Sequence, residues 1–113
     1  MLSKEEKNVL SQKGIYTGYK TVGEYRIQIE QTDGSQIIKF RVEEASSGIF
    51  EFSQSHFIKT PEQATQYITS RNSERTAEDA LMRAVDSIMS HYSQAVKVGH
   101  VPSKAWFKPN KNF

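Results

Sequence analysis

Three basic side chains of a predicted β-hairpin, Arg26, Lys39 and Arg41, could bind an anion. In the register that the turn chemistry predicts, Arg26 lies directly opposite Arg41, and Lys39 lies diagonal to Arg26. Like charges that face each other across a sheet are destabilising, so they need a nearby negative charge. Glu24 and Glu43 in the next rung can supply it. The alternative is that this face binds an anion or an acidic partner.

The C-terminal segment VPSKAWFKPNKNF, residues 101–113, combines large aromatic side chains with lysines. Trp106 and Phe107 stand between Lys104 and Lys108, and two prolines prevent a continuous helix. Rings and cations together can stack on bases and neutralise phosphates, although the segment contains no arginine. It either docks on its own domain, inserts into a protein partner or binds nucleic acid. We favour docking, with Trp106 packed against its own domain or that of a second copy.

A stripe of soft apolar side chains recurs at seven-residue spacing, at Met82, Met89 and Val96. Such a stripe either forms the fringe of the core or, if exposed, suits dimerisation or partner binding. The candidate partner-binding residues are Met82, Met89, Trp106, Phe107, Lys104 and Lys108.

No recognised catalytic or metal-binding pattern occurs in the sequence. The three histidines, His56, His91 and His100, lack the spacing of a metal site. The G-x-S-x-G, H-E-x-x-H and phosphate-loop motifs are absent. We therefore predict no catalytic residues, no metal and no cofactor, and a protein that is not an enzyme.

One long helix, from Thr76 to Gly99, must position much of this chemistry. Thr76 can cap its N-terminus with Asp79 three residues on, and Gly99 can cap its C-terminus ahead of Pro102. At about 1.5 Å per residue, the helix is roughly 35 Å long. Its small or apolar face consists of Ala77, Leu81, Ala84, Val85, Ile88, Tyr92, Ala95 and Val96.

Two runs with alternating apolar residues, 25–30 and 38–43, predict a β-hairpin. If Asp33-Gly34 forms the centre of a type I′ turn, the register follows. That register pairs Ile29 with Ile38, Ile27 with Phe40 and Tyr25 with Val42. All three pairs then lie on one face of the sheet, which a slip by one residue would destroy.

Shorter elements complete an α+β fold, in which an antiparallel meander of three to five strands packs against the long helix. A capping box at Ser3 and Glu6 predicts a helix over 4–13 that ends at Gly14, and a second box at Thr60 predicts a helix over 60–67. Further predictions are a strand over 15–22 bent at Gly18, a turn over 46–48, a strand over 49–53 and a polar connector over 70–75.

Composition indicates one domain over residues 1–99, followed by a docked basic tail over 100–113. The formal net charge of +2 is too small to indicate a nucleic-acid partner, although residues 97–113 carry four lysines and no acid. There is no cysteine, and neither a signal peptide nor a membrane span is apparent. We expect a cytoplasmic protein with no membrane partner.

The phrases GIYTGYKTVGEYR, FEFSQSHFIKTP, TAEDAL and AWFKPN together resemble a group of small, mostly uncharacterised cyanobacterial proteins. At least one small protein of this general kind directly inhibits a ribonuclease of the E type. The resemblance covers most of the chain, but these phrases are not mechanistic motifs, so no site residue is carried over. It implies a regulator that binds another protein.

These observations predict a non-enzymatic regulatory protein that binds another protein, such as an inhibitor of an RNA-processing enzyme. One alternative is a nucleic-acid-binding protein that uses the aromatic tail and the basic sheet face. Another is an oligomer of phage type that sequesters a small anionic ligand. A homodimer is compatible with each of the three.

Overall fold

The computed structural model describes residues 3–12, 18–69 and 72–113. Its elements, in chain order, are α1 (Lys4–Gln12), β1 (Tyr19–Gln31), β2 (Gly34–Ala45), β3 (Phe50–Gln54), β4 (His56–Ile58), β5 (Ser73–Glu74), α2 (Ala77–Lys97), the 3-10 turn η1 (Lys104–Trp106) and β6 (Phe107–Pro109). The predicted α+β class is confirmed. Gly14 and residues 15–17, on which two predictions fell, lie outside the described residues.

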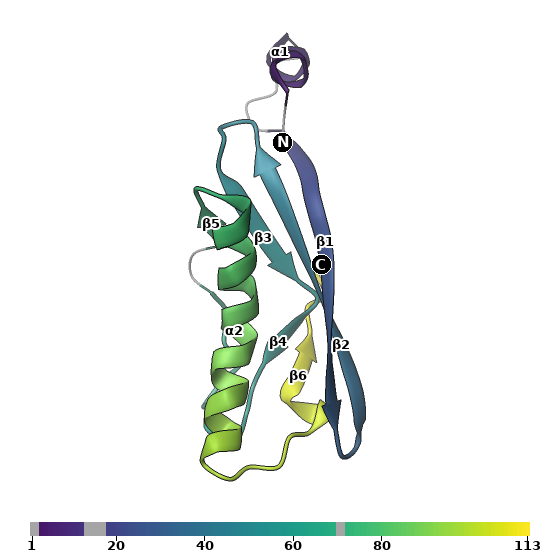
Figure 1. The fold of residues 1–113 in the computed structure, drawn as a ribbon, viewed down its shortest axis with the longest axis vertical. Helices are drawn as coiled ribbons and strands as arrows, with labels where there is room; N and C mark the ends of the chain where they lie inside the picture. The colour runs from purple at the N-terminus through teal and green to yellow at the C-terminus, as the bar shows by residue number, and fades with distance from the viewer. Residues whose placement is uncertain (1–2, 13–17, 70–71) are drawn as a thin grey trace.

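Four strands form one antiparallel sheet in the order β1-β2-β3-β5, and β4 pairs with β6 in a second, two-stranded sheet. The helix α2 packs against β2 and β3 on one face of the larger sheet (Figure 1). The molecule is elongated, 55 × 23 × 23 Å, with α1 at one end and the β1-β2 turn at the other. The most deeply buried core residues are Ile38, Phe40, Val42, Ile58, Ala80, Ala84, Ile88 and Ala95.

The long helix has the predicted ends. The Thr76 hydroxyl accepts a hydrogen bond from the Asp79 amide at 3.1 Å, and Gly99 has a φ of +101° just beyond the last turn. Three alanines of its inner face are fully buried, which lets α2 approach the sheet closely. The predicted helix over 76–99 is confirmed. Its predicted face is right at Ala84, Ile88 and Ala95, but Val96 is exposed, and the buried Ala80 and Ser87 were not predicted.

The register of the β1-β2 hairpin is shifted by two residues from the predicted one. The observed pairs include Ile27 with Ile38, Tyr25 with Phe40 and Gln31 with Gly34. Thr32 and Asp33 are therefore the central turn residues, and neither has the positive φ that a type I′ turn requires. Gly34, with a φ of +120°, follows the turn, as in hairpins where a type I turn is followed by a glycine bulge. The predicted type I′ register is wrong.

A tertiary contact holds this turn in place. The Asp33 carboxylate accepts hydrogen bonds from the Ser103 hydroxyl at 2.9 Å and from the Lys104 amide at 3.1 Å. These two groups lower the pKa of Asp33, the Ser103 hydroxyl having the larger effect. A shift by two residues leaves the same side chains on the core face. The alternation of apolar residues therefore could not distinguish the two registers.

The helix predicted over residues 60–67 is wrong, although its capping contacts do form. Thr60 Oγ1 accepts a hydrogen bond from the amide two residues on, and Gln63 Oε1 accepts one from the Thr60 amide at 2.8 Å. The Gln63 side chain and the Tyr67 amide then both donate to the Ile58 carbonyl. These bonds return the chain along β4, so the turn closes without continuing as a helix.

Strand boundaries differ slightly from the predicted ones. The sheet ladder begins at Tyr19, and its irregularity lies between Thr21 and Gly23 instead of at Gly18. The turn over residues 46–48 is confirmed, with a φ of +87° at Gly48. Three short strands, β4, β5 and β6, were not predicted, because segments of two or three residues carry too little periodicity.

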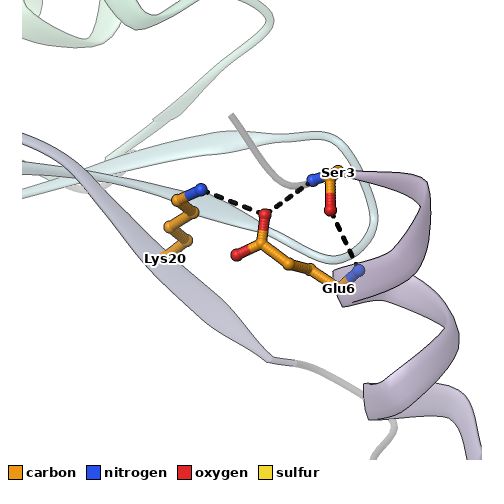
Figure 2. A network of polar contacts seen from close by, with 3 residues as sticks. All are labelled: Ser3, Glu6 and Lys20. Atoms are coloured by element: carbon orange, nitrogen blue, oxygen red, sulfur yellow. Dashed lines mark hydrogen bonds and ion pairs between the residues drawn. The ribbon is translucent and has the colours of Figure 1, made fainter.

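The capping box of α1 is confirmed and includes a third residue. Figure 2 shows that the Glu6 carboxylate accepts hydrogen bonds from the Ser3 amide at 2.9 Å and from Lys20 Nζ at 3.0 Å. The Glu6 amide donates to the Ser3 hydroxyl at 3.0 Å. The Ser3 amide and the Lys20 side chain lower the pKa of Glu6 from 4.5 to about 2.

We expect the stabilisation of this corner to be lost in acid. Because the folded pKa of Glu6 is depressed, its contribution is complete above pH 4.5 and disappears as the pH falls towards 2. An NMR titration of the Glu6 carboxyl carbon should have its midpoint near pH 2, and Lys20→Gln should raise it only in part, since the Ser3 amide remains. A midpoint near 4.5 in the unaltered protein would contradict the assignment.

Candidate functional site

The two aromatic residues of the predicted partner-binding tail lie inside the protein. Trp106 is 6% exposed and Phe107 is 5% exposed. Their rings pack on Tyr92 of α2, with centroid separations of 5.8 Å and 6.3 Å, and Phe107 pairs with Ile58 across β4-β6. Neither ring is available to stack on a base or to insert into a partner. Their selection as partner-binding residues is therefore not supported in this conformation.

The lysines of the tail remain on the surface. Lys104 and Lys108 are exposed, on η1 and β6 respectively. The Lys104 backbone amide is the donor to Asp33, and its side chain passes within 3.3 Å of the position that a Cβ on Gly34 would occupy. Lys104 thus lies over the hairpin turn, away from Met82, so the predicted partner-binding residues do not form one surface.

The basic sheet face is assembled differently from the prediction. Arg26 lies opposite Lys39, not opposite Arg41. Arg41 lies opposite Glu24 and donates from Nε to its carboxylate at 2.9 Å, which is the compensation predicted for this face. Among the described residues, neither Arg26 nor Lys39 has a carboxylate partner. In the part of the chain that the structure describes, these two facing cations therefore have no ion-pair partner.

A shallow groove of about 380 Å³ lies beside these cations. One wall is Phe113, whose ring centre is 4.5 Å from the Arg41 guanidinium carbon, a cation–π distance. Phe113 was not among the predicted site residues. The position of Phe113 depends on the turn after β6, where Asn110 donates hydrogen bonds to the Gln54 and Ser55 carbonyls. No local sequence pattern predicts these long-range hydrogen bonds.

The charges around the groove suit a single anionic group better than an extended polyanion. On the same face of the sheet, Glu43 lies opposite Glu51 one step beyond Arg41. The charge of Glu51 raises the pKa of the Tyr19 hydroxyl, 3.4 Å from its carboxylate. A nucleic-acid strand that followed the sheet beyond Arg41 would therefore meet these carboxylates. Beyond Arg41 the sheet therefore offers no continuous row of cations to neutralise the phosphates of such a strand.

A second groove, of about 420 Å³, runs along α2 and is named here the α2 groove. Met82 from α2 and Tyr67 from the preceding segment both line it, and they are 56% and 39% exposed. The Tyr67 ring lies 4.7 Å, centre to centre, from the His91 imidazole. Met89, one heptad after Met82, instead packs against the core. The methionine stripe is thus divided between the surface and the interior.

Most of the other residues that line the α2 groove are polar, and three of them are acidic. Asp79 and Asp86 lie on its α2 side, and Arg83 forms an ion pair with Glu74 across it. Exposed apolar side chains beside acidic ones fit a protein segment that carries an apolar anchor and a nearby basic side chain. Sequence reasoning identified Met82 but missed Tyr67, because the expected helix over 60–67 would have placed it elsewhere.

The three histidines lie on separate parts of the molecule. His56 contacts Ser55 and Gln36, and burial lowers its pKa. The His91 ring contacts the Tyr67 ring at a tilt of 45°, and His100 Nε2 lies 2.8 Å from the Glu62 carboxylate. Within residues 3–12, 18–69 and 72–113, no three potential ligand side chains come together as a metal site would require.

Comparison of the chain with protein-family models, with curated proteins and with solved structures finds no match. In the described part of the chain, no helix has both the length and the apolar character needed to cross a membrane.

Proposed function

We propose that the chain is a non-enzymatic regulatory protein that acts by binding another protein through the α2 groove. The observation that carries this proposal is the exposed pair Met82 and Tyr67, which line the same groove. Methionine and tyrosine adapt to an apolar anchor and retain a polar contact, and both are enriched at protein interfaces. An RNA-processing enzyme as the partner rests on the resemblance to cyanobacterial regulators.

The test is affinity capture of the partner from the native host, followed by measurement of binding with purified components. We expect Met82→Asp to weaken binding at least about tenfold, because a new charge would be desolvated against the apolar anchor. Ser93→Asp, which places the same charge on an exposed position of α2 about three turns further on, should leave binding unchanged.

Both variants should keep the melting temperature of the unaltered protein, since Met82 and Ser93 are exposed. If Met82→Asp binds the partner as tightly as the unaltered protein does, the α2 groove is not the partner site. An equal loss of binding in both variants would also contradict it, because the effect would then not be specific to the groove.

A further inference from the structure

The outer edge of β1 is open. In the described part of the chain no strand lies beside it, because β1 is the first strand in the order β1-β2-β3-β5. At 13 residues β1 is more than twice the usual strand length of about 5–6. The helix α2 contacts β2 and β3 and does not cover this edge (Figure 1). An open, long edge is a template for pairing with another strand.

The residues that present backbone groups to this edge can be identified from β2. The Lys39 amide donates to the Ser55 hydroxyl and the Lys39 carbonyl accepts from the Ser55 amide, so both groups point away from β1. Arg26 lies opposite Lys39, and its amide and carbonyl therefore point away from β2, towards the open edge. By the two-residue alternation of a strand, Gln28 and Glu30 also present their amides and carbonyls there.

The side chains of the same three residues lie on the face of the sheet opposite α2, and their charges are self-complementary. We propose that two copies of the chain form a dimer by antiparallel pairing of their β1 strands about a two-fold axis at Gln28. This pairing places Arg26 of each copy opposite Glu30 of the other. It supplies a carboxylate to Arg26, which has none among the described residues of its own chain and faces Lys39. On the covered face, Ile27 of each copy pairs with Ile29 of the other.

Charge favours this register over its neighbours. An axis at Ile29 would place Arg26 opposite Thr32 and Glu30 opposite Gln28, so neither charge would gain an opposite one. An axis at Ile27 would oppose Glu24 to Glu30, and an axis at Arg26 would oppose two arginines, both of which are repulsive. An axis at Tyr25 would pair opposite charges but would carry the ladder into the β-bulge of β1. The Gln28 axis uses only the regular part of the strand. The proposal does not depend on the α2 groove or on the proposed function.

The test is the mass of the full chain in solution, measured by sedimentation velocity across a range of protein concentrations. We expect the unaltered protein to have the mass of two chains. Arg26→Glu alone and Glu30→Arg alone should each give the mass of one chain, since each creates two like-charge pairs at the interface. An equimolar mixture of the two variants should recover the mass of two chains, because every carboxylate at these two positions then faces a guanidinium of the other copy.

Two further variants separate this interface from a general effect on folding or charge. Gln28→Pro removes an amide that points to the open edge, where proline is tolerated, so the circular dichroism spectrum should stay unchanged while the dimer is lost. Arg75→Glu makes the charge change of Arg26→Glu at an exposed position outside the sheet and should leave the dimer intact. An unaltered protein with the mass of one chain at all concentrations would overturn the proposal. Single reversals that keep the dimer, or a mixture that stays monomeric, would also overturn it.

Discussion

A chain truncated after Gly99 is expected to lose its cooperative unfolding transition. The truncation removes Trp106 and Phe107 from the core and leaves the apolar residues around Ile58 and Tyr92 exposed. Loss of one buried aromatic side chain typically destabilises a protein by about 3–5 kcal/mol. Two such losses approach the whole free energy of unfolding of a small domain, which is about 5–15 kcal/mol. Thermal unfolding followed by circular dichroism measures the effect.

A shorter truncation, after Asn110, provides the matched control. It retains η1, β6 and the Asn110 contacts, and it removes the contact of Phe113 with Arg41. An exposed cation–π contact contributes about 0.5–1 kcal/mol. The melting temperature should therefore fall by only a few degrees. If the longer truncation behaves like the shorter one, the segment 104–109 is not part of the core.

The burial of segment 104–109 could be predicted from its residue types, but the contacts that order it could not. The aromatic residues at 106 and 107 are too apolar to favour solvent, and the sequence indicated docking for that reason. Trp106 alone could not order the segment, because fixing each backbone residue costs about 1–2 kcal/mol. The additional order comes from pairing with β4, a strand of three residues that the sequence did not predict.

Predictions based on local chemistry were confirmed where tertiary contacts agreed with them. The caps at Ser3 and Thr76 form as expected, because each needs only residues within one helical turn. At Thr60 the same chemistry forms its bonds, yet no helix follows, since the next donors bind the Ile58 carbonyl. In the hairpin, Asp33 is held by Ser103, 70 residues away, and no turn rule contains that contact.

The candidate site could be predicted only in part for the same reason. Arg26, Lys39 and Arg41 were identified as a group, and the structure does place them on one face. Which of them remains uncompensated depends on the register, because a shift by two residues moved Arg41 opposite Glu24 and Arg26 opposite Lys39. The self-complementary edge of β1 follows from that register. It could not have been derived from the predicted one.

Successive side chains of β2 point to opposite faces of the sheet. A substitution on the core face should therefore have a large effect on stability, and the same substitution at the adjacent residue is its control. Ile38 is 0% exposed on the core face, whereas Ile37 is 41% exposed on the opposite face. Ile38→Ala should lower the free energy of unfolding by about 2–5 kcal/mol, because it removes buried methylene groups and leaves a cavity. Ile37→Ala removes the same atoms from the surface and should lower it by about 1 kcal/mol or less, within the range of β propensity.

Urea denaturation of both variants measures the difference directly. The midpoint should shift strongly for Ile38→Ala and little for Ile37→Ala, with the same dependence on urea concentration in both. The comparison depends on which face each residue occupies and is independent of the two-residue shift in register, because that shift preserves the face. Equal destabilisation by the two substitutions would mean that both faces of β2 are covered.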